Sequence, residues 1–134
     1  MAQGSREMLA QAIRGKSEAE ISEFVDAMGG EEFLDVTFEG MAEALRPDKA
    51  QDCVIGYELT HRGRTIPYAL SVRGGKAGFE RRPPTDANVT LALSVPNYLR
   101  LITGQLPVLR SVFMRRLRIR GDRKLARRLQ EMFS

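Results

Sequence analysis

The stretch that decides the fold is residues 93–134, LSVPNYLRLITGQLPVLRSVFMRRLRIRGDRKLARRLQEMFS. Ser94 has a side chain that can cap the start of a helix, and Pro96 is tolerated in a helix's first turn. Gly104 favours the end of that helix, because glycine readily takes the left-handed backbone conformation that follows a last turn. Pro107 fits the start of a second, shorter helix. The stretch is therefore predicted to open with two consecutive helices.

A basic strand and a final helix complete this stretch. Residues 116–120, RLRIR, alternate between basic and apolar side chains, which is typical of a strand with one buried face. Gly121 breaks the alternation, and Asp122 is a good helix cap. The helix that follows has an apolar stripe, which indicates packing against a core. The stripe consists of Leu125, Ala126, Leu129, Met132 and Phe133.

This order of elements resembles the sterol carrier protein 2 (SCP2) sterol-binding domain family. Members of that family end in a helix with Leu-Leu-x-Gly-x-Leu, a Phe-bearing segment, a strand like Lys-Leu-Lys-Ile-x-Gly-Asp and a helix with spaced leucines. The matching residues are Leu101, Gly104, Leu106, Phe113, Leu117, Ile119, Gly121, Asp122, Leu125 and Leu129. The resemblance extends back, with fewer matches, to about Phe33. One departure is Arg115, since family members usually have a glycine just before the basic strand.

The middle of the chain predicts four strands. Residues 53–60 and 66–72 alternate between inward and outward side chains, and residues 76–80 form a shorter third segment after a glycine pair. Residues 81–86, RRPPTD, read as a stiff crossover loop, and residues 87–93 alternate again. With the basic strand, this order predicts an α+β fold, a twisted mixed sheet of about five strands with helices packed on one face. The resemblance to SCP2 implies the same fold.

Two or three helices are expected before the sheet. Residues 5–14 have apolar side chains at helical spacing, and Ser17 with Glu20 forms a capping box for a second helix that ends near Gly29. Residues 31–45 predict a third helix.

We expect an N-terminal helical extension, residues 1–30, followed by one globular SCP2-like lipid-binding unit, residues 31–134. The extension lies upstream of the resemblance. We expect it to pack against the edge of the sheet, and the alternatives are a lid or a dimer contact.

The residues offer little catalytic chemistry. Cys53 is the one cysteine and His61 the one histidine, so neither a disulfide nor a usual zinc site can be assembled. We expect Cys53 to be buried and His61 to be solvated in a turn. The expectation is a protein with no metal, no cofactor and no catalytic residues. A weaker third option is a small enzyme that acts on a hydrophobic substrate and uses Tyr98 or a carboxylate as acid or base.

The first residues lack the apolar run of a signal peptide, and no apolar run approaches the length of a membrane span. These two observations favour a cytoplasmic protein.

Charge is unevenly distributed, with acids dominating up to Asp52 and bases dominating from Pro96 onward. One interpretation is a solvated outer face of a strand and a helix, with pairing to the acidic helices of the same chain as an option within it. Another is attraction to an anionic membrane or an acidic headgroup. Nucleic acid is not expected, because the sequence has no helix-turn-helix, zinc-finger or aromatic-basic RNA motif. The basic surface would include Arg115, Arg116, Arg118, Arg123 and Arg127.

The resemblance implies a ligand site. SCP2-like domains hold a sterol, fatty acyl chain or similar lipid in a tunnel between the sheet and the C-terminal helices. The residues that would line an apolar tunnel at that place are Val89, Leu91, Ile102, Leu106, Leu109, Val112, Phe113, Met132 and Phe133. Periodicity alone favours an ordinary core at these positions, and it is the resemblance that favours the tunnel.

The function expected from these observations is non-catalytic binding and transport of a hydrophobic small molecule, such as a sterol, a fatty acid or an acyl-CoA-like lipid. The alternative is a protein-interaction or dimerisation module, or an accessory subunit of a lipid- or polyketide-pathway enzyme. The partners to consider are the lipid itself, an anionic membrane surface, a second copy of the chain and an enzyme.

Overall fold

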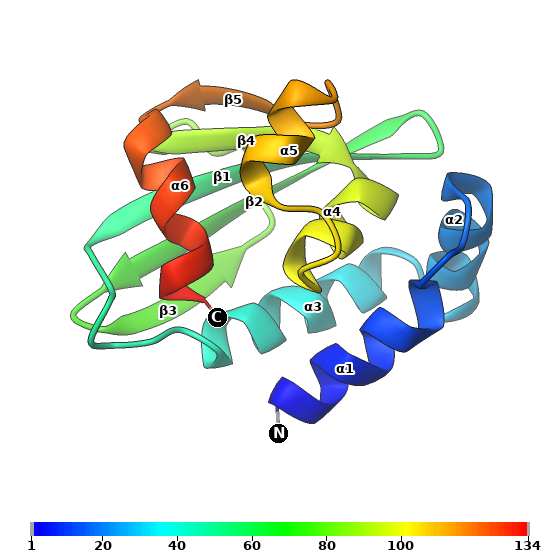
Figure 1. Cartoon of the computed structure of the whole chain (residues 1–134). Coiled ribbons are helices and arrows are strands. Elements are labelled where there is room, and N and C mark those ends of the chain that lie inside the picture. The colour runs from blue at the N-terminus through cyan, green and yellow to red at the C-terminus, as the bar shows by residue number, and fades with distance from the viewer. Residues whose placement is uncertain (1, 134) are drawn as a thin grey trace.

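Helices and strands alternate in blocks along residues 2–133, the part of the chain that the computed structural model describes (Figure 1). The helices are α1 (Ala2–Ile13), α2 (Glu18–Ala27), α3 (Glu31–Glu43), α4 (Val95–Ile102), α5 (Val108–Phe113) and α6 (Arg123–Met132). The strands are β1 (Cys53–His61), β2 (Arg64–Arg73), β3 (Lys76–Glu80), β4 (Val89–Ser94) and β5 (Arg118–Gly121).

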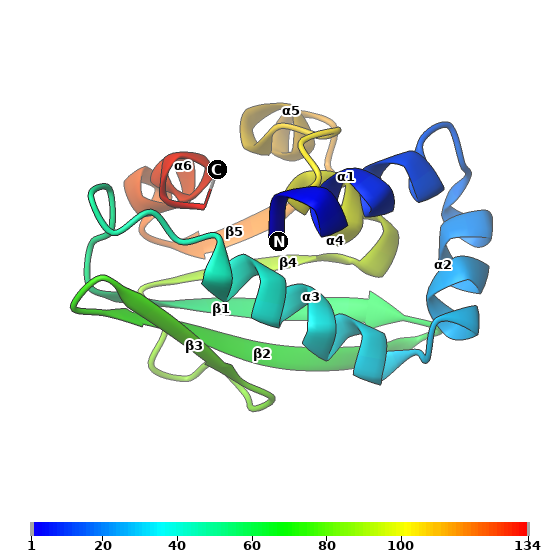
Figure 2. The ribbon, with the colours of Figure 1, turned by 90° about the horizontal axis from the view of Figure 1, so that it is seen from below.

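The five strands form one mixed sheet in the order β3-β2-β1-β4-β5. The pair β1–β4 is parallel, with Ile55 opposite Val89, and the other three pairs are antiparallel. The helices gather on one face of the sheet, with α3 lying along it and α1 and α5 further out (Figure 2). The predicted α+β fold, with a mixed sheet and helices on one face, is confirmed.

An aromatic cluster fixes α3 to the sheet. Phe38 is fully buried. Its ring centroid lies 4.0 Å from that of Tyr68 on β2 and 5.2 Å from that of Tyr98 on α4, both in stacked geometry. Tyr57 of β1 meets the same ring edge-on at 5.1 Å. Because this face of α3 packs against the sheet and α4, other elements can contact only the remaining surface of the helix.

The predicted helix caps are present. Ser17 and Glu20 form the reciprocal capping box of α2. The Ser94 hydroxyl accepts from the Asn97 backbone N–H at 3.3 Å. The Asp122 carboxylate accepts from the N–H groups of the first turn of α6. Each cap satisfies a backbone donor that has no partner within its own helix, which explains why these local signals predicted the helix starts well.

Arg115 keeps the turn that a glycine would make. Its φ is 60°, in the left-handed region. The Arg115 N–H donates to the Val112 carbonyl at 3.0 Å and the Arg116 N–H to the Ser111 carbonyl at 2.8 Å, the two bonds that close a helix ending in a left-handed residue. The departure from the SCP2 pattern therefore leaves this turn intact, but it places a residue with a Cβ in a backbone conformation that is strained for it.

Replacing Arg115 by glycine should raise the free energy of unfolding by about 0.5–1 kcal/mol, because glycine adopts this conformation without the Cβ clash. Urea unfolding measures the change. Arg62 is the other non-glycine residue at positive φ within residues 2–133, and it pairs with Asp26, so Arg62→Gly should raise the free energy of unfolding by less. An unchanged or lowered stability of Arg115→Gly would contradict the strain argument.

Candidate functional site

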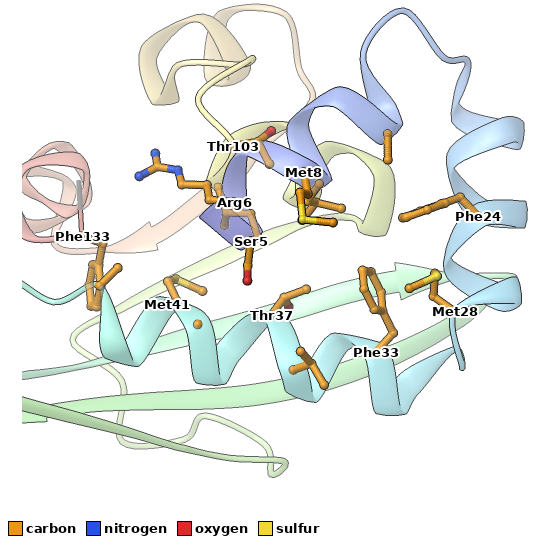
Figure 3. A pocket seen from close by; sticks show the side chains of 16 residues that line it. Ser5, Arg6, Met8, Phe24, Met28, Phe33, Thr37, Met41, Thr103 and Phe133 are labelled. Atoms are coloured by element: carbon orange, nitrogen blue, oxygen red, sulfur yellow. The ribbon is translucent and has the colours of Figure 1, made fainter. Parts of the chain in front are cut away.

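A cavity of about 620 Å³ lies between the N-terminal helices and the outer face of α3 (Figure 3). Its size falls within the range of about 300–1,000 Å³ that is usual for small-molecule sites. Phe24, Met28 and Phe33 gather at one end and Phe133 lies at the other, with Ser5 and Arg6 between them. The shape suits an elongated molecule.

Helices α1, α2, α3 and α4, with the C-cap of α6, contribute the lining. From α1 come Ser5, Arg6, Met8, Leu9 and Ala12, and from α2 come Phe24 and Met28. From α3 and its C-cap come Phe33, Val36, Thr37, Gly40, Met41 and Ala44. The remaining lining residues are Ile102, Thr103 and Phe133. Arg6 is the one charged side chain among these described residues, so the lining is mainly apolar and contains three methionines, which adapt to irregular shapes.

The first helix and the turn after it are held in place by buried side chains and by hydrogen bonds from α4 and the segment that follows α4. Ala10 and Ile13 are buried. The Gln105 side-chain amide donates to the Ala10 carbonyl at 3.1 Å, and Arg100 donates to the Lys16 carbonyl at 3.0 Å. The expectation that this extension packs against the sheet edge is wrong, because α1 and α2 pack mainly on α3 and α4.

Helix α2 is tied to the turn between β1 and β2. The Asp26 carboxylate lies 2.7 Å from His61 Nε2 and 2.8 Å from an Arg62 nitrogen. His61 is only 9% exposed, so the prediction of a solvated turn histidine is wrong. The hydrogen bonds from His61 and Arg62 lower the pKa of the Asp26 carboxyl. These contacts fix the end of the cavity that Phe24 and Met28 form.

Thr37 in the cavity lining forms a polar pair with Tyr98, which is buried beneath it. The Thr37 hydroxyl donates to the Leu34 carbonyl at 2.6 Å, which uses its only hydrogen. The Tyr98 hydroxyl, 2.7 Å away, must therefore be the donor to Thr37. Burial raises the pKa of the Tyr98 hydroxyl well above its ordinary value, so Tyr98 stays protonated and serves as this donor.

Thr37→Val should destabilise the protein by about 1–3 kcal/mol, because it leaves the buried Tyr98 hydroxyl without a partner. Tyr98→Phe should cost less, since Thr37 keeps its bond to the Leu34 carbonyl. Urea unfolding of both variants gives the comparison. If Thr37→Val lowers the free energy of unfolding by no more than Tyr98→Phe does, the assignment of Tyr98 as the donor to Thr37 is wrong.

The tunnel residues expected from the sequence lie in several environments. Ile102 and Phe133 line the cavity. Val89, Leu91, Leu106 and Met132 are buried, and Val112 is half-buried. Leu109 and Phe113, on α5, are 64% and 90% exposed. The structure thus brings two of the nine to this cavity, and the ligand-binding role of the set stays a prediction.

The residues expected to form a basic surface lie around α5, β5 and α6. Arg115, Arg118, Arg123 and Arg127 are exposed, and Arg116 is half-buried. Within residues 2–133 none of these five has an ion pair. The interpretation that they pair with the acidic helices of the chain is therefore wrong. The acids of α3 pair elsewhere, with Glu31 and Asp35 meeting Arg81.

Sequence reasoning missed most of the lining, because the periodicity of a helix shows an apolar face without showing its partner. A usable signal was present in α3. Leu34 and Phe38 account for its face toward the sheet, whereas Val36 lies off that face and is 59% exposed. Met8 and Met28, also more than half exposed, line the same cavity.

The described residues offer few reactive groups. They hold no cluster of three or more metal-binding side chains. Cys53 is buried as predicted, and burial raises the pKa of its thiol, which keeps it unreactive. None of the helices in this part of the chain is long and apolar enough to span a bilayer.

The fold and the cavity define a class: a small α+β domain with a five-stranded mixed sheet and an apolar cavity among its helices. The chain belongs to the SCP-2 sterol transfer family, whose sequence model matches residues 31–134. The resemblance noted in the sequence is thereby confirmed. No curated protein sequence matches the chain.

Solved structures share the fold. Sterol carrier protein 2 from Yarrowia lipolytica, in apo form, is 19% identical, with a TM-score of 0.57 over 74% of this chain and 91% of that one. Palmitated SCP2L2 from Aedes aegypti is 16% identical, with a TM-score of 0.55 over 72% and 87%. The sec-alkylsulfatase Pisa1 from Pseudomonas sp. is 22% identical, with a TM-score of 0.65 over 75% of this chain. The match spans only 16% of Pisa1's length.

Proposed function

We propose that this protein binds and carries a hydrophobic small molecule, such as a sterol, a fatty acid or an acyl-CoA-like lipid, without catalysing a reaction on it. The observation that carries the proposal is the apolar cavity of about 620 Å³ between α1, α2 and α3. Membership of the SCP-2 sterol transfer family supports it. The palmitated state of the Aedes aegypti protein supports an acyl chain as one candidate ligand.

The extension, residues 1–30, forms part of the ligand site in this proposal, and residues 31–134 form the globular unit that it covers. Seven of the lining residues belong to the extension: Ser5, Arg6, Met8, Leu9, Ala12, Phe24 and Met28. The site differs in place from the tunnel between sheet and C-terminal helices that the family resemblance implied.

The binding energy would come from burial of apolar surface. A ligand that buries about 300 Å² of apolar area gains about 7–8 kcal/mol at the usual 25 cal/mol per Å². That gain corresponds to a dissociation constant of about 1–10 μM before ordering costs. No strong polar contact is required, so we expect selection by length and shape more than by headgroup.

A second candidate function is an accessory or interaction module. It is favoured by one observation, that the fold also occurs as a small part of Pisa1, a much longer chain. In that case the partner would be an enzyme or a second copy of this chain.

In the carrier proposal, by contrast, the protein works in the cytoplasm and meets membranes.

Native mass spectrometry of freshly purified protein, followed by organic extraction, separates the two functions. The carrier predicts a bound apolar mass that is released on extraction, or uptake of one fluorescent fatty acid per chain. Bare protein that also fails to take up the fluorescent fatty acid would exclude the carrier. The oligomer mass in the same spectrum would then report on the interaction module.

A further inference from the structure

Helix α5 presents an apolar surface to solvent. Leu109 is 64% exposed, Phe113 is 90% exposed and Met114 is 45% exposed. Single exposed apolar residues are ordinary on soluble proteins, but three large ones within six positions form a local patch. A phenylalanine that is nearly fully exposed gains almost no stability from burial in this fold.

The patch is held outward by the other side of the same helix. Val108 is 4% exposed and Ser111 is 1% exposed, and the Ser111 hydroxyl donates to the Pro107 carbonyl at 2.8 Å. The closed turn at Arg115 fixes the end of the helix. Helix α5 is among the outermost helices, beyond α4 and α6 as seen from the sheet (Figure 2). The patch therefore projects from a fixed support.

Arginines lie next to this patch. Arg115, Arg118 and Arg123 line a shallow hollow between α5, β5 and α6, together with the apolar side chains of Val112 and Ile119. None of these three arginines has an ion pair within residues 2–133, whereas Arg120 beside them is paired with Glu58 at 2.9 Å. Three arginines without an ion pair among the described residues thus line a hollow beside α5, to which that helix contributes Val112.

We propose that this surface, defined by Leu109, Phe113, Met114, Arg115, Arg118 and Arg123, docks on an anionic lipid bilayer. The apolar side chains of α5 enter the boundary between headgroups and acyl chains, and the arginines meet the headgroup phosphates. Apolar insertion combined with basic residues is what binds interfacial helices to anionic membranes. A protein partner would need acidic groups at the rim of an apolar pocket, a more restrictive match.

Membrane docking is a separate property from ligand binding, and the two can be measured separately. The docking proposal rests on the carrier function in one respect: docking would bring the ligand site to a membrane. Gly40 lies in the ligand cavity and not on the docking surface. A Gly40→Leu variant should therefore lose ligand uptake and keep vesicle binding, so that either proposal can fail alone.

The chain contains no tryptophan, which makes Phe113→Trp a clean reporter. Added to vesicles of phosphatidylcholine with 30 mol% phosphatidylserine (roughly the share that gives a negative surface potential), its emission should shift to the blue as the side chain leaves water. Vesicles of phosphatidylcholine alone should give a much smaller shift. Lys76→Trp, on β3 at the opposite edge of the sheet, is the control and should not shift.

Charge reversal tests the arginines. Arg118→Glu with Arg123→Glu should lower the partition coefficient onto the anionic vesicles at least roughly thirtyfold, since each basic residue contributes about a factor of five. Arg73→Glu with Lys76→Glu makes the same charge change at the far edge and should have a much smaller effect. Equal losses in the two double variants, or no blue shift of Phe113→Trp, would overturn the proposal. A shift that follows protein concentration without lipid would also overturn it, and would assign the surface to a second copy.

Discussion

Gly40→Leu should abolish ligand binding and leave the fold intact. Gly40 lies on the cavity side of α3, and a Cβ built there meets no atom within 4 Å. A leucine side chain therefore projects into the cavity and occupies the volume that the ligand needs. Overlap of this kind should lower the affinity for a fluorescent fatty acid by at least about a hundredfold, or about 2.7 kcal/mol.

The same substitution should not destabilise the protein. Leucine is favoured over glycine in a helix interior by about 0.8 kcal/mol, so urea unfolding should show equal or higher stability. Gly78→Leu is the matched control, because Gly78 on β3 is equally open and lies outside the cavity. Unchanged fatty-acid affinity of Gly40→Leu, with the fold intact, would mean that the ligand binds elsewhere or not at all.

Phe38→Ala should destabilise the protein by about 3–5 kcal/mol, the usual loss for a fully buried phenylalanine. Phe38 is 0% exposed and contacts the rings of Tyr57, Tyr68, Phe79 and Tyr98. Removing it leaves a void between α3 and the sheet and takes away stacking with several partners. Because α3 forms the floor of the ligand cavity, fatty-acid binding should weaken as well.

Phe113→Ala provides the comparison, since it removes the same atoms from a side chain that is 90% exposed. We expect a change within about 0.5 kcal/mol, as for ordinary surface substitutions. Urea unfolding of both variants under the same conditions gives the two values. Similar losses for Phe38→Ala and Phe113→Ala would contradict the arrangement of α3 and α5 described above.

The fold could be predicted because its signals are local. Ser17, Ser94 and Asp122 cap helices through backbone groups two or three residues away. The alternation of residues 53–60 specifies a strand by itself. The resemblance to SCP2 added the order of the elements, which local patterns do not supply.

The site could be predicted less well because it depends on contacts between distant segments. The partner of His61 is Asp26, which lies 35 residues earlier, and nothing in the turn sequence indicates it. Phe113 matches a family position and was expected to line a tunnel, yet on the short helix α5 it points to solvent. Residues 1–30 lie outside the resemblance, so no family position indicated that side chains of this extension line the cavity.

Photochemical labelling tests the central claim most directly, that the ligand lies between the N-terminal helices and α3. A diazirine-bearing fatty acid would be bound to the wild-type protein and irradiated, and the labelled residues located by peptide mass spectrometry. The account predicts adducts within residues 5–12 and 33–44, where the lining of α1 and α3 lies. Adducts confined to residues 89–91 and 106–113, or no adduct at all, would contradict it.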